Sequence, residues 1–271
     1  MAFQKLYADL VDAEGSVYVL YLATFDFLGR PLRFAELETY LRGEGRRVYT
    51  GTTASGDQTT LASEQPLEVK LATSVGEFMF RARPVSGSFV PREAPRSGLE
   101  WHVCMGRTEA RLELPQSLGG GVVIGTGYSD HLTVSQPAVR KGLRALDWGR
   151  AHLSGSSIVW TRLKFSDGQV WEKCARWALP GGSAQPGPFT PAENLAVAQI
   201  AAAGGTIESE RVLHVGSALD RSRVPSTPVR WLLRAVAGAT HQRRWVVRIA
   251  EPNCSTAGWG IHESVTFARP R

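Results

Sequence analysis

The sequence predicts an all-β protein, organised as two tandem β-barrels or sandwiches with a few short helices. Short segments rich in β-branched and aromatic residues recur along the 271-residue chain. Glycine-containing turn signals separate these segments, and the second half repeats features of the first. Short strands punctuated by turns at this spacing are typical of barrels and sandwiches.

Strand character in the first half rests on runs of β-branched and aromatic residues. Turn signals at residues 43–45 and 56–57 mark places where the chain reverses direction. Residues 7–12 fit a helix or a strand equally well. The predicted strands of this half cover residues 16–27, 68–71, 77–83, 101–105, 109–114 and 122–124.

The second half shows clearer alternation. Ile158, Trp160 and Arg162 would share one face of a strand, with the intervening residues on the other face. Residues 192–203 fit a helix or a strand on pattern alone. The predicted strands of this half cover residues 157–165, 170–177, 207–215, 244–249 and 261–268.

Two weak internal matches indicate a tandem repeat. Residues 17–29 resemble residues 158–168, and a Gly-aromatic-x-x-His pattern at residues 127–131 recurs at residues 258–262. Each half therefore opens with a long strand and closes with the same pattern. We expect an N-terminal β domain over residues 1–147 and a C-terminal β domain over residues 148–271.

Composition is that of an ordinary globular protein, with 43% hydrophobic and 21% charged residues. No apolar run approaches the roughly 20 residues needed to span a bilayer. The first residues lack a basic segment followed by an apolar core, so no secretory signal is expected. We therefore expect a cytoplasmic protein with no membrane span, as a monomer or homodimer.

Sequence motifs give no indication of a cofactor or a metal. Cys104, Cys174 and Cys254 lie far apart, and no CxxC or Cys/His cluster accompanies them. The glycines at 119–121 precede a predicted strand rather than a helix, so they do not form a dinucleotide-binding turn. We expect no cofactor and no metal.

The net charge of +6 raises the question of a nucleic-acid partner. Eight arginines and one acid, Asp220, lie between Arg211 and Arg248. These arginines interleave with apolar residues, and no nucleic-acid motif accompanies them. We interpret them as a solvated outer face and expect no nucleic-acid partner. The alternative interpretation is that these arginines bind an anionic substrate or a carrier protein.

Residues 127–152 hold the densest set of acids, bases and large aromatics in the chain. Predicted strands lie on both sides of a proline-containing connection within this run. So many polar and aromatic side chains in a β-rich chain indicate a lined cavity rather than a plain core. The run contains Tyr128, Asp130, His131, Asp147, Trp148, Arg150 and His152.

The same run carries a family resemblance. The segments at 127–131 (GYSDH), 147–153 (DWGRAHL) and 155–160 (GSSIVW) resemble the signature of the carotenoid 1,2-hydratase (hydroxyneurosporene synthase) superfamily, whose architecture the fungal Diels–Alderases share. The resemblance implies two lipocalin-like β-barrels and an apolar substrate held within or between them. It also implies chemistry without a metal or nucleotide, in which polyene or isoprenoid chains are hydrated, cyclised or rearranged.

The chain departs from that family at several positions. Asp130 and His131 match, but Leu132-Thr133-Val134 stand where the hydratases have Asn-Trp-Gly. Ala151 and Leu153 stand where the hydratases have a tyrosine and an aspartate. The remaining residues therefore fit cyclisation better than hydration.

Two chemistries set different demands on the site. Protonation of an alkene needs a carboxylic acid kept neutral by an apolar surround, and Asp26 and Asp130 are the acids to consider. A pericyclic reaction needs a pocket that folds a polyene and one or two donors that polarise a carbonyl. Arg150, His131, Tyr128 and Trp148 are such donors.

The leading hypothesis is a cofactor-independent cyclase or isomerase, a pericyclase of the Diels–Alderase kind, acting on a hydrophobic polyene or polyketide/isoprenoid intermediate in natural-product biosynthesis. The alternatives are a hydratase acting on an isoprenoid double bond and a non-catalytic carrier of an apolar ligand. The predicted catalytic residues are Asp130, His131, Arg150 and Asp26. The predicted substrate-binding residues are Tyr21, Tyr128, Trp148, Trp160, Trp171, Trp101 and His152.

Each of these residues also has a purely structural interpretation. Asp130 beside His131 can close a turn at a strand end. His152 can donate to a neighbour, and the tryptophans can be core residues. Asp147 and Arg150 can form an ordinary salt bridge.

Overall fold

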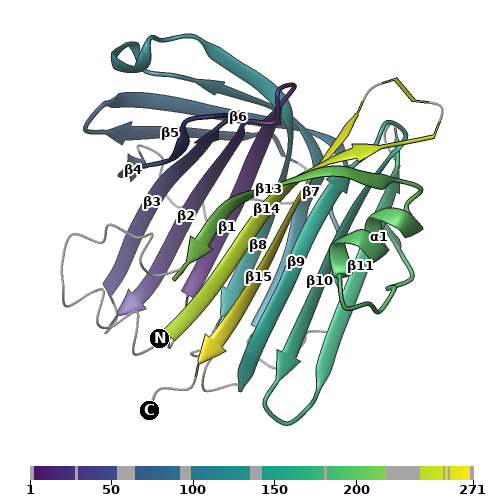
Figure 1. The fold of residues 1–271 in the computed structure, drawn as a ribbon. Helices are drawn as coiled ribbons and strands as arrows, with labels where there is room; N and C mark the ends of the chain where they lie inside the picture. Colours follow the sequence, from purple (N-terminus) through teal and green to yellow (C-terminus); the bar gives the residue numbers. More distant parts are fainter. Residues whose placement is uncertain are drawn as a thin grey trace. The chain divides into compact units, whose positions relative to one another are not determined.

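The computed structural model describes residues 3–27, 30–53, 65–91, 99–134, 142–179, 182–217, 239–252, 254–255 and 257–268. Most of the described residues lie in β-strands, and the chain forms two compact units (Figure 1). The first unit comprises residues 1–92, 100–133 and 177–184. The second comprises residues 93–99, 134–176 and 185–271. No helix in the described ranges is long and apolar enough to cross a membrane.

The first unit is built on a closed eight-stranded barrel in which strands pair in chain order. Neighbouring strands run antiparallel, as β1 and β2 do from Phe3↔Phe25 to Val11↔Val17. A 3-10 turn at Gln116–Leu118 lies between the last two strands. The strands are β1 (Phe3–Asp12), β2 (Val17–Phe27), β3 (Arg30–Leu41), β4 (Gly45–Thr53), β5 (Leu67–Thr73), β6 (Gly76–Ser86), β7 (Leu99–Glu113) and β8 (Val122–Val134).

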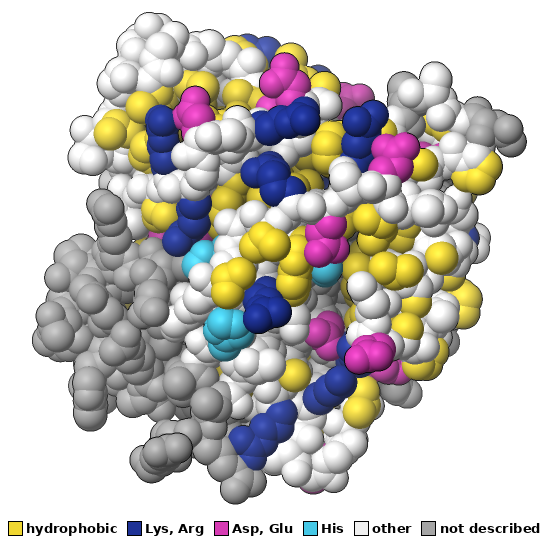
Figure 2. All heavy atoms as spheres, viewed as in Figure 1, with side chains coloured by type: hydrophobic (Ala, Val, Ile, Leu, Met, Phe, Trp, Pro, Cys, Tyr) yellow, Lys and Arg dark blue, Asp and Glu magenta, His cyan; other side chains and the backbone are white. Residues whose placement is uncertain are grey.

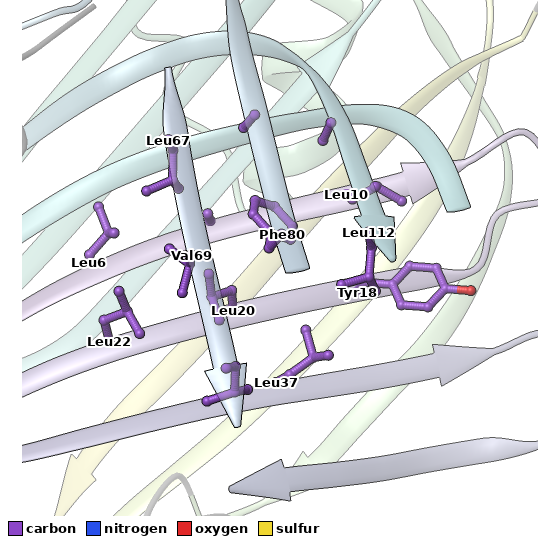
Figure 3. Close-up of a cluster of buried hydrophobic side chains, with 14 of the residues drawn as sticks. Leu6, Leu10, Tyr18, Leu20, Leu22, Leu37, Leu67, Val69, Phe80 and Leu112 are labelled. Carbon is purple, nitrogen blue, oxygen red and sulfur yellow. The ribbon is translucent and has the colours of Figure 1, made fainter. Parts of the chain in front are cut away.

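Aliphatic and aromatic side chains fill the inside of this barrel (Figure 3). Leu6, Ala8 and Leu10 of β1 belong to this buried cluster, as do Leu20 of β2 and Phe80 of β6. Because successive side chains of a strand point to opposite faces, the residues between them point outward from the barrel wall. The outer wall of β1 therefore carries the odd-numbered residues of that strand.

The second unit is a seven-stranded sheet with the order β12-β11-β10-β9-β15-β14-β13. β9 lies in the middle of the sheet and pairs antiparallel with both β10 and β15. The strands are β9 (Leu143–His152), β10 (Ser156–Phe165), β11 (Val170–Ala178), β12 (Gln185–Pro186), β13 (Thr206–Gly216), β14 (Ala239–Ala250) and β15 (Gly258–Ala268).

One helix, α1 (Leu195–Ala202), packs on one face of this sheet (Figure 1). Asn194 caps its N-terminus, since the side-chain oxygen accepts from the Val197 amide at 3.3 Å. Leu195, Ala196 and Ile200 of the helix are buried in one cluster with residues of the sheet, namely Ala151, Leu153, Ile158, Trp160, Val247 and Ile249.

The predicted all-β class is confirmed, and most predicted strands lie within observed ones. Residues 101–105 and 109–114 belong mostly to a single 15-residue strand, β7. The predicted strand at 122–124 is only the start of the 13-residue β8. Asp130 and His131 thus lie inside a strand, so the interpretation of Asp130 as a turn residue was wrong.

The two undecided segments resolve differently. Residues 7–12 belong to β1, and residues 195–202 form α1. Strands β3 and β4 were not predicted, because their residues lack a clear apolar alternation. β9 is the strand expected after the proline-containing connection, although no bounds were predicted for it. The expected domain join between residues 147 and 148 falls inside β9, which pairs on both sides along that stretch.

Candidate functional site

The carboxyl of Asp130 lies at the centre of a buried cluster on the outer wall of the first barrel. The Tyr128 hydroxyl donates to Asp130 Oδ2 at 3.0 Å, and the Trp101 indole Nε1 donates to the same oxygen at 3.1 Å. Tyr128 is fully buried, and Asp130 and Trp101 are 5% and 8% exposed. Tyr128 and Asp130 are two residues apart on β8, so the strand itself places both side chains on one face.

Strand β1 supplies a second tyrosine–aspartate pair next to the first. The Tyr7 hydroxyl donates to Asp9 Oδ2 at 2.9 Å, and both side chains are buried. The Tyr7 ring lies 6.2 Å from the Tyr128 ring and 5.4 Å from the Tyr21 ring, between ring centroids. Tyr7 alternates with the barrel-core residues of β1, so this shared wall is the outside of the barrel.

A glycine allows β8 to approach β1 this closely. A Cβ on Gly127 would lie 1.9 Å from the backbone oxygen of Asp9, a distance that real Cβ atoms do not reach. Any other residue at 127 would therefore push the two strands apart. The glycine of the Gly-aromatic-x-x-His pattern is thus a packing requirement at the barrel closure.

Burial raises the pKa of the Asp130 carboxyl, and the charge of Asp9 adds to the rise. The charge of Lys5 and the hydrogen bonds from Trp101 and Tyr128 act in the opposite direction, but they do not reverse it. The Lys5 ammonium lies over the rings of Tyr21 and Tyr7, 5.5 and 5.8 Å from their centroids. Asp130 therefore keeps a proton more readily than an exposed aspartate does, and a protonated carboxyl is a donor.

His131 does not belong to this cluster. It follows Asp130 directly in β8, so its side chain leaves the opposite face, the one on which Val123 packs against the barrel core. Burial lowers the pKa of His131, and the charge of His102 lowers it further. The imidazole is therefore mainly neutral near pH 7.

Three predicted residues of the second unit share one face of β9. Trp148, Arg150 and His152 are spaced by two residues and are 8%, 0% and 2% exposed. The His152 ring nitrogen Nδ1 lies 3.0 Å from Ser157 Oγ. Trp160 pairs with Gly149 and lies on the other face, in the core beneath α1. The structure thus separates Trp160 from the other three.

The remaining predicted residues have separate surroundings. Trp171 of β11 is partly buried, and the Lys173 ammonium lies 5.7 Å from its ring centroid. Asp26 lies in β2 opposite Pro31, and its side chain lies outside the described residues. Asp147 forms an ion pair with Arg162, at 2.8 Å, in place of the salt bridge with Arg150 that was the alternative structural interpretation.

Sequence reasoning missed Lys5, Tyr7 and Asp9. A signal for two of them was present, because Tyr7-Ala8-Asp9 repeats the Tyr-x-Asp spacing of Tyr128-Ser129-Asp130. In a strand that spacing puts the tyrosine hydroxyl beside the carboxyl. The two motifs meet because the barrel closes between β8 and β1.

Among the described residues, no group of three or more histidine, cysteine, aspartate or glutamate side chains is arranged to hold a metal ion. The cluster around Asp130 offers one carboxyl with a raised pKa, its two hydrogen-bond donors and several aromatic faces. That arrangement can donate a proton or a hydrogen bond next to an apolar molecule.

Comparison with solved structures identifies the fold. The structure of CghA with Sch210972 matches with a TM-score of 0.58 at 11% identity, covering 100% of this chain and 89% of that one. An AttH-like protein from Nitrosomonas europaea matches at 0.55 and 14% identity, covering 98% and 92%. Kievitone hydratase from Nectria haematococca matches at 0.52 and 11% identity, covering 97% and 88%.

No protein-family model and no curated protein sequence matches the chain. The structural likenesses extend over nearly the whole chain, and they support the architecture that the sequence resemblance implies. At these identities they establish the fold alone.

Proposed function

We propose that the chain is a cofactor-independent cyclase or isomerase that acts on a hydrophobic polyene or polyketide/isoprenoid intermediate in natural-product biosynthesis. The observation that carries this proposal is the buried carboxyl of Asp130, whose raised pKa favours the protonated form beside the rings of Trp101 and Tyr128. The fold shared with kievitone hydratase is consistent with an enzyme of this general kind.

The hydrogen bonds determine which oxygen of Asp130 carries the proton. Both donors, Trp101 Nε1 and the Tyr128 hydroxyl, point at Oδ2. In a neutral carboxylic acid the oxygen that accepts hydrogen bonds is the carbonyl oxygen, so the proton resides on Oδ1. Oδ1 is therefore the atom that would donate to a substrate carbonyl and polarise a conjugated double bond.

The aromatic rings supply the second requirement. Cyclisation of a flexible polyene is slow mainly because the chain must adopt one reactive shape, and a rigid apolar wall removes part of that entropic cost. Tyr7, Tyr21 and Tyr128 lie in ring contact on adjoining strands, so they form such a wall. Their faces also stabilise positive charge that develops along the polyene.

The test is turnover of a panel of linear polyene and isoprenoid intermediates, followed by chromatography and mass spectrometry. We expect products with the mass of the substrate, formed faster than in buffer. Asp130→Asn should lower the rate by about 10²–10⁴-fold, the range for loss of a positioned acid. Asp167→Asn, which changes an exposed turn acid in the same way, should leave the rate unchanged. A panel that cyclises no faster than in buffer would refute the proposal.

Hydration is the second candidate, and the same carboxyl favours it. In that reaction Asp130 Oδ1 gives its proton to one alkene carbon, water bonds to the cationic carbon, and a proton of that water returns to the carboxylate. A neutral acid in an apolar surround is the group this step needs. A product heavier by one water molecule would select this reaction over cyclisation.

A carrier remains the non-catalytic alternative, because lipocalin-like cavities hold ligands without chemistry. A copurifying apolar ligand that is recovered unchanged, together with full retention of binding in Asp130→Asn, would select it. Arg150 and Trp148 are the next residues to substitute, since each is nearly or fully buried although it carries a polar group.

A further inference from the structure

We infer that the second unit has its own ligand site, formed by Glu210, Trp245 and His262, which binds a planar aromatic molecule that carries a hydroxyl group. The site lies on the face of the second sheet that α1 covers in part. It uses none of the residues around Asp130, so it stands independently of the proposed function.

The centre of the site is a pair of stacked rings. Trp245 of β14 and His262 of β15 are direct cross-strand partners. Their ring centroids are 4.5 Å apart, and the ring planes differ by only 7°. His262 Nε2 lies 3.3 Å from Glu210 Oε2 on β13. Three adjacent strands thus fix one flat stack and hold its imidazole in a defined orientation, and a further planar ring can extend the stack.

A buried apolar core lies next to the stack. Gly149 of β9 is paired with Trp160 on one side and with His262 on the other. A Cβ at this glycine would lie 2.3 Å from the Trp160 ring and 3.0 Å from His262 Cβ, so only glycine lets both side chains lie against the strand. Trp160 and Val247, which pack with α1 in the core next to the stack, are each 1% exposed.

The polar atoms beside this core remain accessible. The side chains of His262 and Glu210 are 15% and 39% exposed. Along β14 this face changes from buried Val247 through partly buried Trp245 to exposed Arg243. Figure 2 views the molecule from this side and shows histidine and charged side chains set among hydrophobic ones. Reachable polar groups beside apolar and aromatic side chains are a feature of small-molecule sites.

The charges around His262 set the protonation state of its imidazole, and this state determines which polar group of a ligand the site binds. Arg162 of β10 binds Asp147 through Nε at 3.0 Å and Nη2 at 2.8 Å, so that carboxylate is already matched. Burial lowers the pKa of His262, although Glu210 and Asp147 act against the change. The imidazole is therefore mainly neutral near pH 7.

A neutral imidazole that donates Nε2–H to Glu210 has Nδ1 as an acceptor. Acceptance occurs in the ring plane, so the stack on Trp245 does not block it. An acceptor selects an O–H donor over an ether or a carbonyl. The ligand class that fits both features is therefore a phenol-like aromatic.

The test is calorimetric titration of the full chain at pH 7 with 2-naphthol and with 2-methoxynaphthalene, which has the same rings but no donor. We expect 2-naphthol to bind about three- to tenfold more tightly, the value of one hydrogen bond. His262→Phe keeps a ring in the stack and should abolish the preference. Equal affinity for the two probes, or a preference that survives His262→Phe, would overturn the inference.

Two further variants locate the effect. Glu210→Gln should reduce the preference, because an amide fixes the imidazole less strongly than a carboxylate does. Glu208→Gln is the matched control, since Glu208 makes an exposed ion pair with Arg248 at 3.2 Å on the same strand and should change nothing. Asp130→Asn should also leave naphthol binding unchanged, so failure of the proposed enzyme and failure of this site give different results.

Discussion

Replacing Asp130 by asparagine should stabilise the protein increasingly as the pH rises. Asparagine has nearly the same shape as aspartate, and its Oδ1 can still accept the hydrogen bonds from Trp101 and Tyr128. It cannot ionise. The variant therefore removes the cost of a buried charge while it keeps the packing and the two donors satisfied.

The sign follows from the direction of the pKa shift. The folded-state pKa of Asp130 is raised above the value of 3.8 that applies to an exposed aspartate. Folding therefore disfavours the ionised form, so the stability contributed by Asp130 is fully present below pH 3.8 and is lost as the pH rises through the folded-state pKa. In the variant this loss is absent.

The expected effect is measured as the slope, against pH, of the difference in unfolding free energy between the two proteins. Between pH 3.8 and the folded-state pKa, the unfolding free energy of Asp130→Asn minus that of the wild type should rise by up to about 1.4 kcal/mol per pH unit, and it should level off above that pKa. The pH at which the rise ends measures the pKa of the proposed acid without any substrate.

Urea unfolding of both proteins across pH 4 to 8 provides the measurement, about the range in which folded domains are most stable. Asp167→Asn, an exposed acid in a turn, is the control and should give a nearly flat difference. A difference that is flat for Asp130→Asn, or one that falls with pH, would refute the reasoning that burial raises the pKa of this carboxyl.

Three further predictions concern packing, charge and thiol reactivity. Gly149→Ala should lower the unfolding free energy by about 1–3 kcal/mol in urea, because the new Cβ overlaps a tryptophan ring; an unchanged midpoint would contradict this. Arg244→Met should cost about 3–5 kcal/mol in the same assay, since it removes a guanidinium that is 1% exposed and that binds the Glu263 carboxylate; a loss below about 1 kcal/mol would show that water replaces the pair. Iodoacetamide at pH 8 should label partly buried Cys254 well before Cys104, because burial raises the pKa of the latter to about 12; peptide mass spectrometry with the reverse order would contradict the burial of Cys104.

The candidate site was predicted in part. Asp130 and Tyr128 were singled out because residues 127–152 are dense in polar and aromatic side chains and because residues 127–131 carry the family resemblance. Trp101 was predicted as a binding residue, but its hydrogen bond to Asp130 depends on how β7 is placed against β8. Lys5 and Asp9 were missed, since only barrel closure brings β1 against β8.

Some residues that were predicted to act together lie on opposite faces of a strand or sheet. His131 matches the family signature next to Asp130, yet neighbouring residues of a strand leave opposite faces. Trp160 and Trp148 are divided in the same way between the two faces of the second sheet. Asp130 was also interpreted as a turn residue because aspartate is common in turns, whereas it lies inside β8, and the close approach of β1 explains Gly127.

The amino-acid sequence by itself determined the fold class, most strand positions and the acid at the centre of the candidate site. These follow from local chemistry, since alternation and turn residues act over a few neighbouring positions. The tertiary structure decided which side chains share a wall, which carboxyl is buried beside aromatic rings, and where a histidine stacks on a tryptophan. Those properties depend on desolvation and on contacts between strands that are distant in the sequence, and no local pattern encodes them.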